Sequence, residues 1–431
     1  MPDSAHRVRL EGVDFSTAFP ILRLFESFRM ALQPTKLLLG LLMLLLIYFG
    51  GVGLDFIWGE QAYDHSTGFI ELKGEYFIFE DTLQSELAGF HNLINSAARF
   101  DLGLNALASG QPATTGIVPA LRSMVIETPA WVWSKHPWFF VVFVSYVLVI
   151  KMVLGGAIAR LAATQACAGT TVGLFETARF TWPRVVWFVV SPLIPLLIAG
   201  VIWLVLAVTG WVLFNVPGLN VVGGLLFWLM LFGGFVAACC LIFAALGVGM
   251  LPSALAVEGT DAFDVVSRVF TFLLYRPMRY LILSAVMLVY GALTYLIVGL
   301  IVFLTLWFTR SATGIWVTDF DQLLPAAELG QPLGELDTTG LSSTDKAASW
   351  LIRVWSALLF GISIAYAASY FFTAQTWLYL LLRRDVDGSA FEEYAEEPAS
   401  MQTVVPSSAD ASEKIEPAPN DEAASGDDAP S

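Results

Sequence analysis

The chain has 431 residues, of which 57% are hydrophobic and only 14% are charged. A soluble globular protein carries about 25% charged residues, so this composition excludes a soluble domain, a disordered chain and a nucleic-acid-binding protein. The formal net charge of −15 is concentrated in residues 385–431, where 13 acidic residues and one basic residue, Lys414, give −12. The acidity therefore belongs to this last segment and not to the body of the protein.

Six stretches are long and apolar enough to cross a bilayer as helices, which takes about 20 residues each. They cover residues 37–57, 137–159, 185–209, 221–250, 280–308 and 350–382. The first of them carries only Asp55 as a charge and is expected to be an uncleaved span. Hydropathy therefore predicts an all-α integral membrane protein with six transmembrane helices.

The distribution of Lys and Arg predicts the orientation, because these residues gather in the cytoplasmic segments of membrane proteins. Fifteen of them fall on one side of the six predicted spans and seven on the other. We therefore expect both termini in the cytoplasm and the protein in the inner (cytoplasmic) membrane.

The predicted spans divide the chain into seven segments. They are a cytoplasmic amphipathic segment (1–36), a first transmembrane helix (37–58), an external helical cap (59–136), a four-helix transmembrane core (137–308), an external irregular loop (309–349), a sixth transmembrane helix (350–384) and a disordered acidic cytoplasmic tail (385–431). The cap is inferred from an apolar stripe between Phe79 and Ala97 at helical spacing, followed by a second helix that ends before Pro129. The tail has too few apolar residues to order itself.

A duplicated pattern lies between the spans. One copy reads Ala-Cys-Ala-Gly at 166–169, then Leu-Phe-Glu at 174–176, Arg179 and Pro-Arg at 183–184. The other reads Ala-Val-Glu-Gly at 256–259, then Phe-Asp at 263–264, Arg268 and Arg-Pro at 276–277. Each copy follows an inward-running span and precedes an outward one, so the internal repeat is parallel. Each predicts a short amphipathic helix in the membrane plane.

The faces of these in-plane helices can be assigned from helical spacing. In the second helix, Thr260 is the expected N-cap and Asp264 pairs with Arg268 at i,i+4. A third in-plane helix near the N-terminus is expected to end at Pro34. The predicted apolar stripes are Phe263, Val266, Phe270 and Leu274 in the second helix; Phe175, Ala178 and Trp182 in the first; and Ile21, Phe25, Phe28 and Leu32 in the third, where Arg23, Glu26 and Ser27 face water.

The ordered motifs of residues 130–300 carry a resemblance to a known family. They are Gly-Gly-Ala-Ile-Ala-Arg at 155–160, Ser-Pro-Leu-Ile-Pro at 191–195, Asn-Val-Pro-Gly at 215–218 and Val-Glu-Gly-Thr-Asp-Ala-Phe-Asp-Val-Val-Ser-Arg at 257–268. This region resembles an uncharacterised family of bacterial multi-pass membrane proteins and, more loosely, the membrane domains found beside glycerophosphodiester phosphodiesterases. The resemblance implies a helical membrane fold and supplies no activity or catalytic residue.

Motifs of enzyme chemistry are absent from the sequence. It has no zinc-ligand spacing, no nucleophile elbow and no phosphate-binding Lys motif, so we expect no cofactor and no metal. One pattern could still form an enzyme site: Glu258, Asp261, Asp264 and Arg268. Its paired carboxylates, Asp261 and Asp264, could hold Mg²⁺ against a phosphate at the interface. Helix capping and an ion pair explain the same two residues.

One polar group inside the predicted spans is a candidate site. Lys151 lies within the second span, where a charge costs roughly 2.5–3.5 kcal/mol on insertion scales. Its side chain either extends toward the cytoplasmic interface or faces the bundle. The sixth span offers Tyr366 and Tyr370 on a polar stripe, which predicts hydrogen bonds between helices or, alternatively, a substrate path.

These patterns support three hypotheses about function. The first is a non-enzymatic membrane scaffold or accessory subunit, in which Arg179 and Arg268 contact a cytoplasmic protein at the in-plane helices. The second is the membrane subunit of a permease or exporter that works with a cytoplasmic ATPase. The third is a lipid-headgroup enzyme that uses Asp261 and Asp264. The bilayer is the expected surrounding, a homo-oligomer stays open and no nucleic acid is expected to bind.

Overall fold

The computed structural model describes residues 24–58, 62–63, 70–71, 78–103, 116–316 and 342–388. Within these ranges, six helical segments are long and apolar enough to cross a membrane. They are α3 (Pro34–Trp58), α8 (Pro137–Ala168), the segment Leu174–Asn215, α12 (Leu219–Gly247), α15 (Pro277–Gly314) and α17 (Ser343–Asp387). The prediction of an all-α multi-pass membrane protein is confirmed. The described strands, β1 (Ala62–Tyr63) and β2 (Ile70–Glu71), form one short antiparallel pair.

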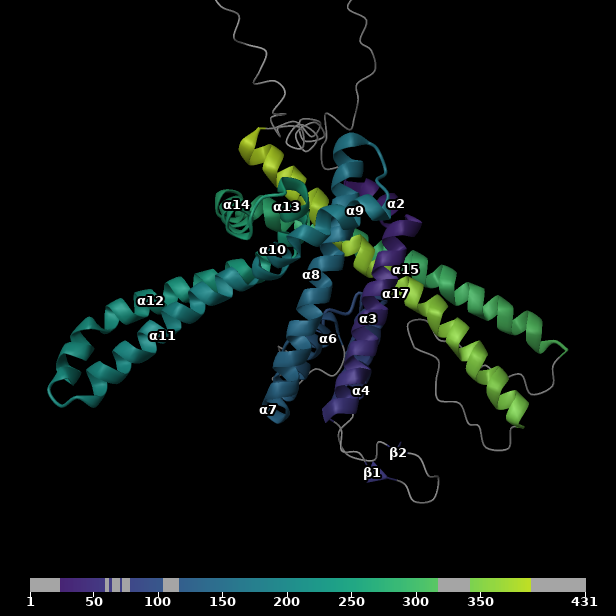
Figure 1. The fold of residues 1–431 in the computed structure, drawn as a ribbon, viewed down its shortest axis with the longest axis horizontal. Helices are drawn as coiled ribbons and strands as arrows, with labels where there is room; N and C mark the ends of the chain where they lie inside the picture. Colours follow the sequence, from purple (N-terminus) through teal and green to yellow (C-terminus); the bar gives the residue numbers. More distant parts are fainter. Residues whose placement is uncertain are drawn as a thin grey trace, which may run out of the picture.

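The six long helices form three arms that diverge from a common end (Figure 1). One arm is the hairpin of α11 (Leu193–Asn215) and α12, a second holds α3 and α8, and the third holds α15 and α17. At the common end the chain forms α2 (Glu26–Ala31), α9 (Leu174–Thr181), α10 (Val185–Val190), α13 (Leu251–Glu258) and α14 (Ala262–Tyr275). We call these five helices, with the adjoining ends of α8, α15 and α17, the hub.

The largest buried core of the protein lies in the hub. Every residue from Leu251 to Val257 of α13 is buried, because α8, α14 and α17 surround this helix. The same core extends into α17, where residues 377–382 are 2% exposed or less. In the α11–α12 hairpin, by contrast, most large apolar side chains are exposed, including Trp203 at 69% and Leu225 at 76%. An exposed apolar surface of this extent is stable when lipid covers it.

The two copies of the sequence repeat each contain a turn of the same conformation. Gly169 after α8 has φ 66°, and Gly259 after α13 has φ 68°, both in the left-handed region that favours glycine. Each glycine N–H bonds to the carbonyl four residues earlier and ends its helix. An amphipathic helix follows each turn, α9 in the first copy and α14 in the second. The parallel repeat is therefore present in the backbone.

The third span is interrupted near its prolines. The chain forms a 3₁₀ turn η3 (Trp182–Arg184), then α10, and breaks at Ser191 and Pro192 before α11. Proline removes a backbone donor and clashes with the preceding turn, which explains the break. The expected external loop 309–349 is helical at both described ends, since α15 runs to Gly314 and α17 begins at Ser343. Ser342 caps α17 by accepting the Asp345 N–H at 3.2 Å. This N-cap favours a helix start at Ser343 in spite of the polar composition that predicted an irregular loop.

The first connection packs beside the arms. It forms α4 (Ile78–Ala98), α6 (Ile117–Arg122), a π-helical turn η2 (Ser123–Glu127) and α7 (Thr128–Lys135). The expected end before Pro129 is wrong, because Pro129 lies in the first turn of α7, where its missing N–H has no partner to lose. The Phe90 ring of α4 lies 5.4 Å from the ring of Tyr295 in α15, so α4 fills the angle between two arms. The N-terminal 23 residues, the acidic tail beyond 388 and the side chains of Ile94 and Ala97 lie outside the described part of the chain.

Candidate functional site

A buried carboxylate lies at the centre of the hub. Glu258 is the last residue of α13, and its side chain is only 6% exposed. Burying an unpaired charge costs several kcal/mol, so the fold must supply partners for it. It supplies them from α14 and α17, two helices that reach Glu258 from different parts of the sequence.

Two arginines and a tyrosine hold this carboxylate. Arg383 Nη1 lies 2.6 Å from Glu258 Oε1, and Arg268 Nη1 lies 3.3 Å from Glu258 Oε2. The hydroxyl of Tyr379 donates to Glu258 Oε1. Burial opposes the charge of Arg268, but the Glu258 and Asp264 carboxylates outweigh it and raise its pKa. We call Glu258, Arg268, Arg383 and Tyr379 the hub ion network; it joins α13, α14 and α17.

The structure corrects part of the expected arrangement around Asp261 and Asp264. The predicted pair of Asp264 and Arg268 is confirmed, with Nε 3.1 Å from Oδ2. The predicted N-cap at Thr260 is wrong: Asp261 occupies that position, and its side chain makes no capping hydrogen bond. Asp261 is exposed and separate from the ion network, since the turn at Gly259 carries the chain past Thr260 before it becomes helical. In the described ranges, no three His, Cys, Asp or Glu side chains form a metal-binding group.

A second charged contact links the two copies of the repeat. The guanidinium carbons of Arg160 and Arg184 lie 4.1 and 4.2 Å from the centre of the Phe180 ring. Arg160 Nη1 donates to the carbonyl of Ala256 at 2.9 Å, and Arg184 Nε to that of Gly259 at 3.3 Å. Cations are favourable at the negative end of a helix dipole, so these arginines stabilise the C-terminus of α13. The first copy of the repeat therefore supports the second.

The two candidate contact residues, Arg179 and Arg268, differ in their surroundings. Arg268 is engaged in the hub ion network, with 37% of its side chain exposed. Arg179, its counterpart in the first copy, is exposed on α9. Arg179 is therefore the more accessible of the two to a partner protein.

The in-plane helices expose apolar residues that were expected to line one stripe. On α9 the predicted stripe faces outward, with Phe175 85% and Trp182 80% exposed, and α9 buries Thr177 and Thr181 instead. On α14, Val266 is buried while Phe263 and Leu274 are 66% and 59% exposed. On α2, Ser27 is buried although it was expected to face water, and its hydroxyl donates to the Leu24 carbonyl. Apolar side chains therefore face outward on both α9 and α14. The buried side of α14 is also apolar, whereas α9 buries two threonines.

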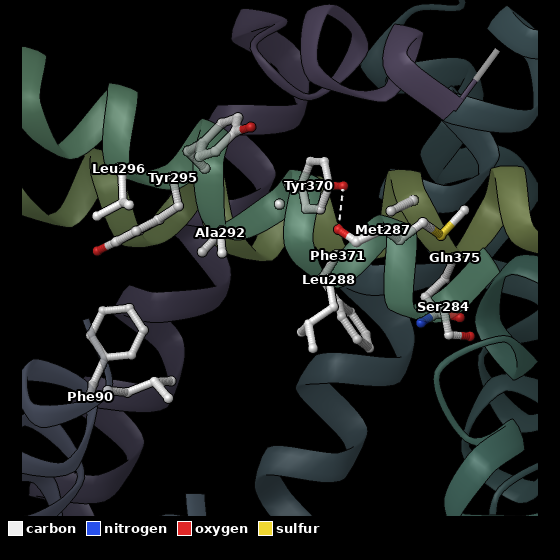
Figure 2. Close-up of a pocket in the computed structure, with 15 residues that line it drawn as sticks. Phe90, Ser284, Met287, Leu288, Ala292, Tyr295, Leu296, Tyr370, Phe371 and Gln375 are labelled. Atoms are coloured by element: carbon white, nitrogen blue, oxygen red, sulfur yellow. Dashed lines mark hydrogen bonds between the residues drawn. The ribbon is translucent and has the colours of Figure 1, made fainter. Parts of the chain in front are cut away.

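The predicted intramembrane residues Tyr366 and Tyr370 line a common cavity of about 460 Å³ between α4, α15 and α17 (Figure 2). The Tyr370 hydroxyl donates to the Met287 carbonyl at 2.8 Å, as a hydrogen bond between helices. A Cβ added at Gly291 would lie 2.4 Å from the Tyr370 ring, so this glycine is what lets the ring pack against α15.

The third predicted intramembrane residue, Lys151, does not line this cavity. It is exposed on α8, where its charge acts on Glu86 of α4. Burial raises the pKa of Glu86, and a hydrogen bond from Thr128 and the Lys151 charge oppose that rise. Lys151 therefore interacts with a carboxyl group on α4, a helix that the sequence did not place beside it.

Two buried charges have structural roles that the sequence did not indicate. Lys36 falls in the predicted cytoplasmic segment 1–36, yet it is fully buried and its Nζ donates to Gln165 Oε1 at 3.0 Å. Asp55 is 5% exposed and accepts the backbone N–H groups of Phe79 and Glu80 at 2.9 to 3.2 Å, which caps α4 from α3. An acid near the end of an apolar span is the signal that points to such a cap.

Comparisons with protein-family models, curated proteins and solved structures found no match for this chain.

Proposed function

We propose that the protein is a non-enzymatic scaffold or accessory subunit of a membrane complex, and that a cytoplasmic protein docks on the hub. The observation that carries this proposal is the surface of α9 and the adjoining turn η3, where Phe175, Arg179 and Trp182 are all exposed. Arginine and large aromatic side chains are the residues most enriched at interaction hot spots. On the same helix, the Phe180 ring contacts the guanidinium groups of Arg160 and Arg184, which fixes α9 against the rest of the hub.

The proposed setting is the inner membrane of a bacterium, with the hub in the cytoplasm. The support is the excess of Lys and Arg in the segments on the hub side of the spans. The first and last described helices, α2 and the end of α17, both pack in the hub, which accords with termini on one side. The sequence resemblance of residues 130–300 supports the bacterial origin and adds no activity.

The test is affinity purification of the full chain from native membranes, followed by mass spectrometry. Arg179→Glu should remove a stoichiometric partner, and Arg276→Glu, a charge reversal at another exposed hub residue, should retain it. A partner retained equally by both variants would contradict docking at α9. Solute transport by the purified protein alone in liposomes would contradict the scaffold itself.

A second candidate is the membrane subunit of an exporter that a cytoplasmic ATPase drives. It is favoured by one specific feature: the two repeat copies are in contact, since Arg184 after α9 donates to the carbonyl of Gly259 at the end of α13. A force on α9 would therefore reach α13 and its charges. An ATPase that copurifies with the wild-type chain and is lost with Arg179→Glu would favour this candidate over a passive scaffold.

A lipid-headgroup enzyme that uses Asp261 and Asp264 receives the least support. Asp264 is paired with Arg268, and Asp261 projects elsewhere at the start of α14. Replacing both by Asn should leave any activity of the native complex unchanged.

A further inference from the structure

We propose that the cavity between α4, α15 and α17 binds one acyl chain of a bilayer phospholipid, with the polar part of the lipid at Ser284 and Gln375. This site is separate from the docking surface on α9 and does not depend on it. The cavity lies along the membrane-spanning parts of α15 and α17, and Phe90 and Leu93 of α4 form its opposite wall.

The lining of the cavity has the chemistry of a lipid tail. Leucine, methionine, phenylalanine and alanine side chains make up most of it, including Met287, Leu288, Ala292 and Leu296. Two of the lining side chains face outward, since Leu288 is 74% and Phe371 is 45% exposed. The cavity is therefore reached from the lipid side of the bundle, where acyl chains are the solvent.

One end of the cavity is polar and incomplete. Ser284 Oγ and Gln375 Oε1 are buried there. Ser284 interacts with the Tyr280 hydroxyl, and Gln375 Oε1 has no hydrogen-bond partner in the described structure. Figure 2 shows the two side chains next to each other at this end. A buried polar atom without a partner destabilises the protein, and a ligand with a hydroxyl or ammonium donor would remove that destabilisation. Phospholipid headgroups carry such donors, and the glycerol esters accept a hydrogen bond from a serine hydroxyl.

The position of the polar end matches the level of lipid headgroups. Ser284 follows Arg279 by five residues, and Arg279 forms an ion pair with Asp385 at the hub end of α15. From Ser284 to Leu296 the cavity follows twelve residues of helix, or about 18 Å. One leaflet of hydrocarbon is about 15 Å thick, half of the bilayer core. A lipid of the hub-side leaflet would thus place its headgroup at the polar end of the cavity and its acyl chain along the apolar part.

The experiment uses the full chain in vesicles of phosphatidylethanolamine and phosphatidylglycerol that contain a trace of phosphatidylethanolamine with a photoreactive acyl chain. Illumination should label peptides covering 284–296 and 366–375 more strongly than peptides from the exposed helices α11 and α12. Ala292→Trp fills the cavity and should reduce this labelling at least fivefold. Leu293→Trp is the matched control, because Leu293 is 56% exposed and does not line the cavity, and it should leave the labelling unchanged.

Further variants keep the proposal falsifiable. If Ala292→Trp does not fold, Ala367→Phe fills the same cavity from α17. The double variant Ser284→Ala, Gln375→Leu should lower the amount of copurified phospholipid, measured by native mass spectrometry, and preserve labelling by a free photoreactive fatty acid. Equal labelling of Ala292→Trp and Leu293→Trp, or a crosslink to a second protein chain in place of lipid, would overturn the proposal.

Discussion

The hub and the α11–α12 hairpin are stabilised in different ways. In the hub, helices from distant parts of the sequence meet around buried charges, among them Glu258 and Arg383. In the hairpin, the two helices pack mainly on each other, and their large side chains, such as Trp203 and Leu225, face outward.

This difference shows what determines structure in each region. Lipid solvates an apolar helix whichever apolar residues it presents, so the hairpin depends on composition more than on particular side chains. The buried ion pairs of the hub form only when its helices are in one arrangement. Removing either partner of a pair leaves an uncompensated buried charge. Substitutions should therefore have large effects in the hub and small ones on the hairpin surface.

The largest expected effect is at the hub ion network. Glu258→Ala leaves Arg268 and Arg383 without their shared carboxylate and should destabilise the protein by about 3–5 kcal/mol. The measurement is unfolding of the detergent-solubilised chain by heat or denaturant. Asp264→Ala removes a partly exposed partner of the same arginine and should cost no more than about 1 kcal/mol. Equal losses of stability for the two variants would mean that the burial of Glu258 does not increase its contribution over that of Asp264.

An intermediate effect is expected where α3 caps α4. Asp55→Ala should cost about 0.5–2 kcal/mol, as loss of an N-cap does, and should speed amide hydrogen exchange at the start of α4. Asp81→Ala, at an exposed residue in the first turn of α4, is the control and should leave exchange at Phe79 nearly unchanged. Protected amides in Asp55→Ala would show that α4 is held by its apolar contacts alone.

The smallest effect is expected on the hairpin. Trp203→Ala and Leu225→Ala remove exposed side chains that lipid covers, so the stability in bilayer nanodiscs should change by no more than about 0.5 kcal/mol. Unfolding in nanodiscs provides the measurement. A loss above 2 kcal/mol for either variant would indicate that this surface packs against another protein chain and would remove the contrast with the hub.

The spans and the repeat could be predicted from the sequence because their signals are local. Twenty apolar residues predict a membrane helix wherever they occur, and Gly169 and Gly259 mark the turns that end two helices. The Asp264–Arg268 pair was also predictable, since both residues lie on one helix. The contact of Glu258 with Arg383 was not, because 125 positions separate them and only packing brings them together.

The faces of the in-plane helices were beyond sequence reasoning for a different reason. Periodicity separates apolar from polar residues, but both lipid and the protein core accept apolar ones. Phe263 and Val266 were therefore assigned to one stripe, although Phe263 is exposed and Val266 is buried. Lys36 was placed in the cytoplasmic segment because Lys marks such segments. Its buried position could not be foreseen, since its partner Gln165 lies on another span.

The most direct test of a cytoplasmic hub is cysteine labelling in intact cells. The background would lack the native cysteines Cys167, Cys239 and Cys240, and single cysteines would replace Arg179 on α9 or Ser134 on α7, both exposed. We predict that a membrane-impermeant maleimide labels Ser134→Cys in intact cells and labels Arg179→Cys only after permeabilisation. Labelling of Arg179→Cys from outside intact cells would contradict a cytoplasmic hub, and with it the proposed docking of a cytoplasmic partner.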